Sequence, residues 1–137
     1  MLKQISVFTA NTQGALGKMT AVLAAHKINI FTMLANDSAE FGIVRIIADK
    51  AEDAEKVLRE AGYQCRIDRV IAIDMASDKP GSLNRILQDL QNANVMIKYL
   101  YISFDRESNS PIAVFRTDEP EAETFLIGKG YRLLDTF

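Results

Sequence analysis

The sequence predicts an α+β protein in which two βαββαβ units, residues 1–68 and 69–137, stand side by side. Three observations support this fold class. The two halves of the chain repeat each other, the spacing of apolar residues switches between strand and helix periods within each half, and no flexible linker separates the halves. We therefore expect one continuous antiparallel sheet with helices on one face.

The internal repeat consists of segments that match in the same order along both halves. Gly14 and Gly81, each followed by one residue and then a leucine, lie 67 positions apart. At this spacing, or one residue more, three further pairs match: Ile28–Ile30 with Val95–Ile97, Ala54–Leu58 with Ala122–Leu126, and Gly62–Tyr63 with Gly130–Tyr131. A unit of about this size buries only about 60% of its surface and is marginally stable alone. The two copies are therefore expected to need each other.

The first half opens with a predicted strand, residues 2–9, followed by an amphipathic helix. One stripe of this helix carries Leu16, Met19, Leu23 and His26, with Ala15 and Val22 beside it. Residues 28–35 and 41–48 are rich in apolar and β-branched side chains, and the five residues between them predict a hairpin loop. A second helix has Ala51, Ala54, Leu58 and Ala61 inward and the pairs Glu52/Lys56 and Glu55/Arg59 outward. Gly62 ends this helix, and residues 63–68 predict the last strand.

The second half repeats this order. Its first helix carries one apolar stripe, formed by Leu83, Ile86, Leu87, Leu90 and Ala93. The predicted hairpin loop spans residues 105–110, and the second helix is expected to open at 117–120 with Pro120 in its first turn. Each half thus has the ferredoxin-like order, with two helices on one face of a four-stranded sheet. Because residues 66–70 lead almost directly from one copy into the next, we expect the edge strands to pair into one eight-stranded sheet.

Both faces of the predicted sheet carry apolar side chains. In residues 28–35 and 42–48 they occur at both alternating positions, which indicates burial on both sides. We expect the helix-free face to pack on a second copy of the chain, giving a homodimer; the alternative is a solvated face with exposed β-branched side chains. The first strands of the two halves differ in which alternate positions are apolar. At the offset of 67 residues, Ile71 and Ile73 align with Gln4 and Ser6 rather than with Ile5 and Val7. Without a bulge, the inward face of these strands stays unassigned.

The composition excludes several classes of function. Sixteen basic and eighteen acidic side chains give a net charge of −2, and no Lys/Arg run is present, so nucleic-acid binding is not expected. The richest apolar stretch, residues 95–104, contains Lys98 and is about half of the roughly 20 residues that a bilayer requires. The first residues lack the pattern of a signal peptide, and we expect a cytoplasmic protein.

Catalytic and metal-binding patterns are also missing. The chain has one cysteine, Cys65, and one histidine, His26, which argues against a disulfide or a His-rich metal site. No Gly-x-Ser-x-Gly motif or Gly-rich phosphate loop occurs, and Gln13-Gly14 stands where metal chaperones of this topology have Cys-x-x-Cys. RNA-binding proteins of this topology need basic residues on their strands, and in this sequence Arg45 and Arg116 are isolated there. We therefore expect no enzyme, no metal and no cofactor.

The turn between the first strand and the first helix is the most distinctive chemical element. In the second copy, Asp78-Lys79-Pro80-Gly81 places a glycine where a helix opens. Free backbone N–H groups and the helix dipole favour a carboxylate or phosphate there, and glycine lets a ligand approach the backbone. Asp78 can either cap the helix or pair with the ammonium group of a ligand.

These motifs together resemble the ACT domain, a small ligand-sensing module of amino-acid metabolism. The resemblance rests on the Pro-Gly-x-Leu turn, the Ile-Asn-Ile that enters strand two and the Gly-Tyr that enters strand four, and it covers both halves. It implies a tandem ACT protein with side-by-side domains and a non-catalytic, allosteric regulatory role. It also implies a free amino acid bound between paired domains by the first turn and the start of strand two.

Carried over by position, the resemblance implies two sets of ligand-binding residues. In the first copy they are Asn11, Thr12, Gln13, Gly14, Ala15 and Leu16 of the turn, with Asn29 and Ile30 of strand two. In the second copy they are Asp78, Lys79, Pro80, Gly81, Ser82 and Leu83, with Met96 and Ile97.

The two copies depart from the family pattern in different ways. The second copy keeps the acidic residue and the proline but has Met96 where the first has Asn29. The first copy has Asn11 in place of the acid and Gln13 in place of the proline. A composite site, with the turn of one copy facing strand two of the other, would use both sets. One good site is therefore favoured over two equivalent ones.

An alternative function belongs to the same family. The chain can be a regulatory subunit that docks on an amino-acid biosynthetic enzyme and controls it, instead of a free-standing amino-acid sensor. The two functions differ in a protein partner, for which the sequence holds no signal.

Overall fold

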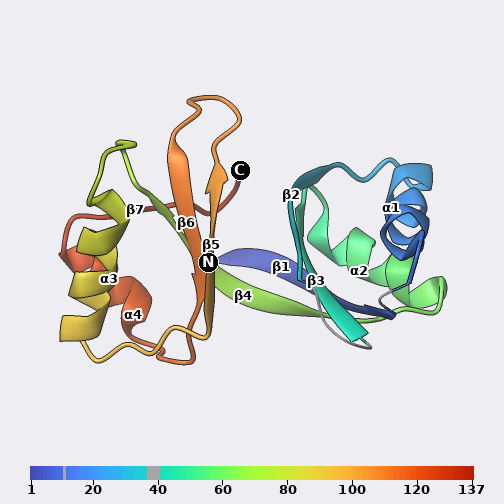
Figure 1. Ribbon diagram of the computed structural model, residues 1–137, viewed down its shortest axis with the longest axis horizontal. Coiled ribbons are helices and arrows are strands. Elements are labelled where there is room, and N and C mark those ends of the chain that lie inside the picture. The colour runs from blue at the N-terminus through green and yellow to red at the C-terminus, as the bar shows by residue number, and fades with distance from the viewer. Residues whose placement is uncertain (11, 37–40) are drawn as a thin grey trace. The chain divides into compact units, whose positions relative to one another are not determined.

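The computed structural model describes residues 1–10, 12–36 and 41–137 (Figure 1). By its internal contacts the chain divides into two compact units. We call Lys3–Asp68 the N-terminal unit, and Arg69–Phe137 together with Met1–Leu2 the C-terminal unit. Each is described by itself.

The N-terminal unit follows the βαββαβ order. Its elements are β1 (Leu2–Ala10), α1 (Ala15–Ala25), β2 (Ile30–Ala35), β3 (Phe41–Ala48), α2 (Ala51–Glu60) and the first part of β4 (Gln64–Asp74). The strand order is β2-β3-β1-β4, and β3 pairs antiparallel with both β1 and β2. The register places Ile5 opposite Ile46.

The C-terminal unit repeats this order with shorter final elements. The second part of β4 is followed by α3 (Ser82–Asn92), β5 (Tyr99–Phe104), β6 (Pro111–Arg116), α4 (Ala122–Gly128) and β7 (Arg132–Leu133). Here β6 lies between β5 and β4, and the short β7 pairs with β4 on its other side. The α+β class and the order predicted for both halves are confirmed.

One strand belongs to both units. The sequence analysis expected one strand to end at Asp68 and another to follow it, but β4 runs without a break from Gln64 to Asp74. The described residues therefore form a sheet of seven strands rather than the eight expected, because the single strand β4 replaces two predicted strands. The reason lies in the sequence, because residues 66–70 contain no glycine or proline to end the strand.

The core of the N-terminal unit lies between one face of its strands and both helices. Ile5, Val7, Val44 and Ile46 face Met19 and Leu23 of α1 and Ala54 and Leu58 of α2. The apolar stripe predicted for α1 is therefore confirmed at Met19 and Leu23 in its centre. It is wrong at its two ends, Leu16 and His26. Leu16 is 39% exposed in the first turn, and the exposed His26 holds its ring Nδ1 2.9 Å from the carbonyl oxygen of Val22 at the helix end.

A local distortion explains the phase conflict between the two first strands. Ile71 and Ile73 face the helices of the C-terminal unit, as Ile5 and Val7 do in the N-terminal unit. The C-terminal copy has one more residue between its core strand residues and the glycine, because Ile73 lies eight positions before Gly81 and Val7 seven positions before Gly14. Ala76 in this segment takes a left-handed φ of 62°. The Ala76 N–H donates to the Asp74 carboxylate over 2.8 Å. This turn accommodates the extra residue, and it has the same effect as the bulge that the sequence comparison required.

The second helices differ from expectation at their starts and on their surfaces. Helix α4 begins at Ala122, so Pro120 precedes it, and the Glu119 N–H donates to the Thr117 hydroxyl over 3.1 Å. On α2 the Glu55–Arg59 pair forms at 3.6 Å, whereas Glu52 pairs with Lys3 of β1 instead of Lys56.

Truncation of the matching core leucines tests the two-core description. Leu58 and Leu126 are fully buried at equivalent places in α2 and α4. We expect Leu58→Ala and Leu126→Ala each to lower the free energy of unfolding by about 2–5 kcal/mol, because each leaves a cavity in its own core. Urea unfolding measures both.

Ile127→Ala is the matched control, because Ile127 is next to Leu126 but 57% exposed. Its cost should stay below about 0.5 kcal/mol. A loss at Ile127 equal to that at Leu126 would contradict the assignment of the buried face of α4.

Candidate functional site

The turn between β1 and α1 leaves backbone donors free. Gly14 occupies the N-cap position with a left-handed φ of 80°, and no described side chain caps the helix. The Ala15 N–H donates to the Thr12 carbonyl over 3.1 Å, and the Lys18 N–H donates to Gly14 over 3.0 Å. The N–H groups of the intervening residues of the first helical turn have no helical acceptor.

The turn between β4 and α3 has the same geometry. Gly81 is the N-cap with a φ of 93°, the Ser82 N–H donates to Lys79 over 3.1 Å, and the Arg85 N–H donates to Gly81 over 3.0 Å. In the part of the chain that the structure describes, no side chain caps α3, so Asp78 does not act as its cap. Of the two roles considered for Asp78, helix capping is therefore not the one found.

The charge at the helix starts separates these two helices from the other two. Helix α2 has Glu52 and Asp53 in its first turn and α4 has Glu123, whereas α1 and α3 have no acidic residue there. A negative group near a helix N-terminus is stabilised by the dipole and the free N–H groups. The starts of α1 and α3 thus lack a protein anion and suit an external one.

A cleft of about 530 Å³ lies beside the Gly14 turn. We call it the turn cleft. Its walls are the end of β1, the turn, α1 as far as Lys18, and the segment that enters β4, and its lining residues are Phe8, Thr9, Ala10, Thr12, Gln13, Gly14, Ala15, Lys18, Gly62, Tyr63 and Gln64. Lys18 is the charged residue in this described lining, so the cleft is electropositive.

A smaller hollow of about 260 Å³ lies on the other side of the turn. It shares Thr9, Ala10, Thr12, Gly14 and Ala15 with the turn cleft. Its remaining walls are mainly apolar: Leu16, Gly17, Ala35, Asn36, Gly42 and Val44. A polar cleft and an apolar hollow therefore meet at one glycine turn.

The predicted strand-two residues lie away from the turns of their own units. Asn29 and Ile30 follow α1, whose eleven residues separate them from the Gly14 turn by about 16 Å of helix. The Asn29 N–H donates to the Asp49 carboxylate over 3.0 Å, which fixes this backbone to the start of α2. Within one unit, the structure does not bring the turn and the start of strand two together.

The C-terminal unit shows the same separation. Met96, which is 75% exposed, and Ile97 line a hollow of about 350 Å³ at the end of α3 opposite to Gly81. Of the other predicted residues, Thr12–Leu16 and Asp78–Leu83 gather at their respective turns, and Asn11 lies outside the described residues. A composite site made from different units stays a prediction.

Sequence reasoning missed several residues of the cleft. Lys18 lies one helical turn after Gly14, and the i, i+4 spacing would have placed it at the mouth. Tyr63 and Gln64 were missed because they are distant in sequence. The antiparallel β1–β4 pairing brings the start of β4 to the end of β1, which the predicted topology already implied.

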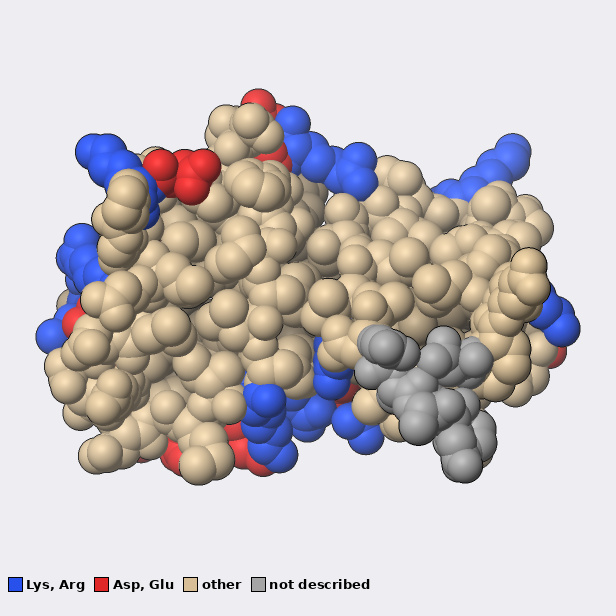
Figure 2. Space-filling view, in the orientation of Figure 1, with Lys and Arg blue, Asp and Glu red and all other residues tan. Residues whose placement is uncertain are grey.

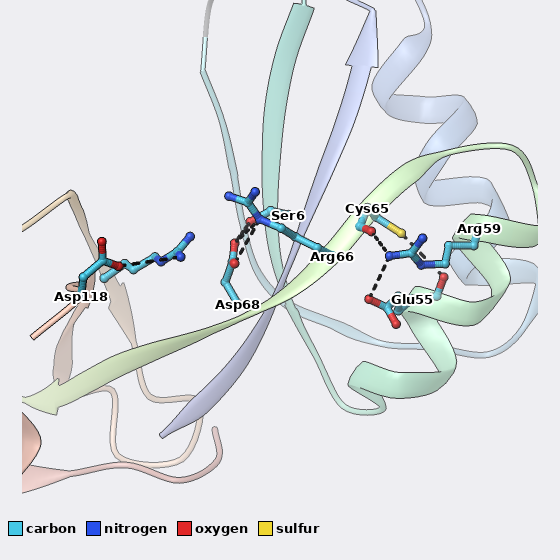
Figure 3. A network of polar contacts seen from close by, with 8 residues as sticks. Ser6, Glu55, Arg59, Cys65, Arg66, Asp68 and Asp118 are labelled. Atoms are coloured by element: carbon cyan, nitrogen blue, oxygen red, sulfur yellow. Dashed lines mark hydrogen bonds and ion pairs between the residues drawn. The ribbon is translucent and has the colours of Figure 1, made fainter. Parts of the chain in front are cut away.

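The polar residues of β4 form contacts that fit a structural role (Figure 3). The Arg59 guanidinium contacts the Glu55 carboxylate and donates to the Cys65 carbonyl, so it ties α2 to β4. Burial raises the pKa of the Cys65 thiol, with a smaller opposing effect from Arg59. A thiol that is buried and protonated is a poor nucleophile.

A buried serine also lies on this strand pair. The Ser6 hydroxyl donates to the Asp68 carboxylate over 2.7 Å, and Arg66 Nε donates to the same carboxylate over 3.1 Å (Figure 3). His26, held at the end of α1, is not part of this group. Within the described ranges, no three His, Cys, Asp or Glu side chains gather where they could hold a metal ion.

The surface charge is dispersed. Figure 2 shows basic and acidic side chains of the described residues mainly near the edges of the drawn face, without a broad positive area. Helices in the described segments are too short or too polar to cross a bilayer.

The C-terminal unit holds a compact cluster near its own turn, which we call the Tyr131 cluster. The Tyr131 hydroxyl donates to the Asp89 carboxylate, and the Arg85 guanidinium lies 5.6 Å from the centre of the Tyr131 ring. Desolvation, and after it the Asp89 hydrogen bond, raise the pKa of Tyr131 to about 12. The cluster joins α3 to the segment that enters β7.

The chain belongs to the ACT domain pair family, whose model matches residues 1–132. This assignment confirms the resemblance inferred from the order and duplication of the sequence motifs. No curated protein matches the chain significantly.

Solved structures show the same fold. Protein BT0572 from Bacteroides thetaiotaomicron is similar to this chain at 29% identity and a TM-score of 0.86, with 97% of this chain and 91% of that chain covered. The ligand-free regulatory subunit of aspartate kinase from Thermus thermophilus is similar at 16% identity and a TM-score of 0.68, covering 93% and 90% of the two chains. The corresponding subunit from Thermus flavus has 17% identity, a TM-score of 0.63 and coverages of 91% and 88%.

Two alanine substitutions at the site should change stability in opposite directions. A Cβ at Gly14 or Gly17 would meet no atom within 4 Å, so backbone conformation decides the effect. Gly14→Ala should cost about 1–2 kcal/mol, because an L-residue disfavours the left-handed region. Gly17→Ala should stabilise the protein by up to about 1 kcal/mol, because alanine is the better helix former. Equal signs in urea unfolding would contradict the turn geometry.

Tyr131 should produce a pH-dependent loss of stability. Its folded-state pKa of about 12 lies above the ordinary value of 10.0, so its contribution is complete below about pH 10 and is lost as the pH rises through about 12. The difference in unfolding free energy between the wild type and Tyr131→Phe should shrink over this range. Lysine titration is common to both proteins and cancels. A difference that stays constant from about pH 9 to 12 would rule out the hydrogen-bonded, neutral tyrosine.

Proposed function

We propose that this chain is a non-catalytic sensor that binds a free amino acid and regulates amino-acid metabolism. The observation that carries the proposal is the uncapped, glycine-started helix α1, whose free N–H groups open beside an electropositive cleft and an apolar hollow. Membership of the ACT domain pair family supports the same ligand class.

The chemistry of an amino acid fits the two hollows. A carboxylate takes the place of the missing acidic residue at the start of α1, where the N–H groups and the Lys18 ammonium are positive. The side chain of the ligand occupies the apolar hollow, which is lined by Leu16 and Val44. The ammonium group of the ligand is expected to meet strand carbonyls beside the turn.

Binding would act on an existing equilibrium. In the composite arrangement, the turn of one unit and strand two of another contact the same ligand, so an occupied site holds two ACT units together. A ligand that binds this arrangement more tightly than the open one shifts the population toward it. A partner protein would then respond to the fraction of molecules in which the ligand holds the units together.

We also propose a homodimer formed through the helix-free sheet face. Its support is the apolar character of both faces of β3, where Val44 and Ile46 belong to the core and Ile43, on the other face, pairs with Phe8, which is 37% exposed. Sedimentation equilibrium at micromolar concentration should give twice the 15.3 kDa mass of the chain. A monomer under these conditions would overturn this part of the proposal.

Regulation of an enzyme is the second candidate function. It is supported by the Thermus thermophilus neighbour, which is named a regulatory subunit of aspartate kinase and matches over 90% of its length. The test measures the activity of the aspartate kinase from the same source organism, with and without this chain and with amino acids added. No change in activity would leave the free-standing sensor as the better function.

Thermal unfolding with each of the twenty amino acids tests the main proposal. A ligand at 100 times its dissociation constant should add about 2.7 kcal/mol to the free energy of unfolding, because it binds the folded state alone. We expect a rise in melting temperature with one amino acid or a related few. A melting temperature unchanged by all twenty would contradict the sensor function.

A further inference from the structure

The solvent face of α1 is apolar, which sets this helix apart from its counterpart in the other unit. Four exposed positions of α1 hold small apolar residues, and the repeat offset of 67 residues places an amide side chain at each equivalent position of α3. The positions are Gly17, Ala21, Ala24 and Ala25 in α1, and their counterparts, also exposed, are Asn84, Gln88, Gln91 and Asn92.

This contrast indicates that the two solvent faces meet different surroundings. A helix on a protein surface normally presents polar residues to water, as α3 does, and a helix that is apolar all round is normally covered. Met19 and Leu23 already fill the core side of α1. The outer side of α1 is therefore available for contact with another molecule.

A groove of about 460 Å³ lies beside this face, between α1 and α2. Its apolar lining consists of Ala21, Val22, Ala25, Val57 and Ala61, and its polar lining of Lys18, His26 and Glu60. Val22 and Val57 also contact the core of the unit, so the groove reaches down to the core.

The spacing of the small residues fits a second helix as the occupant. Gly17, Ala21 and Ala25 recur every four residues, so they form one row along the helix. Rows with this spacing pack against one another when two helices cross, and small side chains let the two backbones approach closely. The same row on a second copy of the chain has the shape that this contact requires.

The charges beside the groove also favour a second copy. Residues 15–27 contain Lys18 and Lys27 and no acidic residue, whereas Glu60 lines the groove from α2. Lys27 and Glu60 form no ion pair or side-chain hydrogen bond with any described residue. In a two-fold contact centred on Ala21 the crossing helices are antiparallel, so Lys27 of one copy approaches the end of the groove where Glu60 of the other copy lies beside Lys18.

We propose that two copies of the chain associate through α1, with the row of Gly17, Ala21 and Ala25 packed on the same row of the other copy and Lys27 paired with Glu60 across the contact. This inference goes beyond the proposed function and does not depend on it. The contact uses the helix side of the unit and leaves the helix-free sheet face available for the homodimer proposed above. A single pair of crossing helices falls below the roughly 1,200 Å² of a standard interface, so we expect association at about 0.1–1 mM.

Sedimentation equilibrium of the full chain at about 5 μM and about 500 μM tests the inference. The mass at the higher concentration should rise toward twice the mass at the lower one. Ala21→Glu should weaken this association at least about tenfold, because it places two like charges at the centre of the contact. The matched control is Gln88→Glu, which puts the same charge at the equivalent exposed position of α3 and should leave the association within about twofold.

Ala21→Leu distinguishes close helix packing from general hydrophobic association. Leucine adds apolar surface but holds the two backbones apart, so we expect the association to become weaker than in the wild type. Stronger association of this variant would overturn the packing of α1 on α1.

A charge exchange tests the antiparallel arrangement. Lys27→Glu and Glu60→Lys should each weaken the association at least about threefold, because each places like charges opposite one another. The double variant restores the pair with its signs reversed and should associate within about twofold of the wild type. A double variant as weak as the single ones would overturn the pairing of Lys27 with Glu60.

The remaining outcomes decide the contact as a whole. A wild-type mass that is equal at both concentrations would overturn it, and so would equal losses for Ala21→Glu and Gln88→Glu or unchanged association of Ala21→Glu. All substituted positions are exposed, and circular dichroism checks that each variant is folded. The mass at the lower concentration reports the sheet-face homodimer separately, so the failure of one proposal leaves the other standing.

Discussion

The first helix of each unit begins at a glycine in the left-handed conformation, and the candidate site depends on this constraint. The glycine turns the chain sharply from β1 or β4 into a helix that no described side chain caps. The N–H groups that a serine or aspartate cap would occupy therefore stay open beside the turn. Since α1 and α3 also lack acidic residues in their first turns, the protein presents a positive helix end twice. What differs between the two places is the set of side chains around them.

Duplication explains why the molecule has two similar turns that differ in the side chains around them. The two cores are built alike, with a pair of β-branched residues on the first strand of each unit and a buried leucine on the second helix. The sequence of the helix surfaces is less restricted, because these positions do not pack in the core. Val22 still packs against the core of its unit, whereas its counterpart Asp89 accepts the hydrogen bond of the Tyr131 hydroxyl.

Much of the fold could be predicted from the sequence. The apolar spacing and the repeat gave the class, the element order and the central core residues Met19, Leu23, Ile86 and Leu90, because burial imposes a strict period on helices. The unbroken β4 and the turn at Ala76 were missed, since strand ends and single-residue bulges depend on pairing that spacing does not encode. At the site, Gly14 and Gly81 were found through a local motif. Lys18 and Tyr63 were not found, because they reach the cleft through a helical turn and a strand pairing.

The continuity of β4 constrains how this protein can vary. Its odd-numbered residues supply both cores, Cys65 and Ile67 to the first and Ile71 and Ile73 to the second. Strand side chains alternate strictly, so inserting or deleting one residue near Asp68 would turn the downstream isoleucines to the opposite side. Insertions or deletions at this junction are therefore tolerated only in even numbers of residues. The loops that join the other strands can change in length by any number of residues.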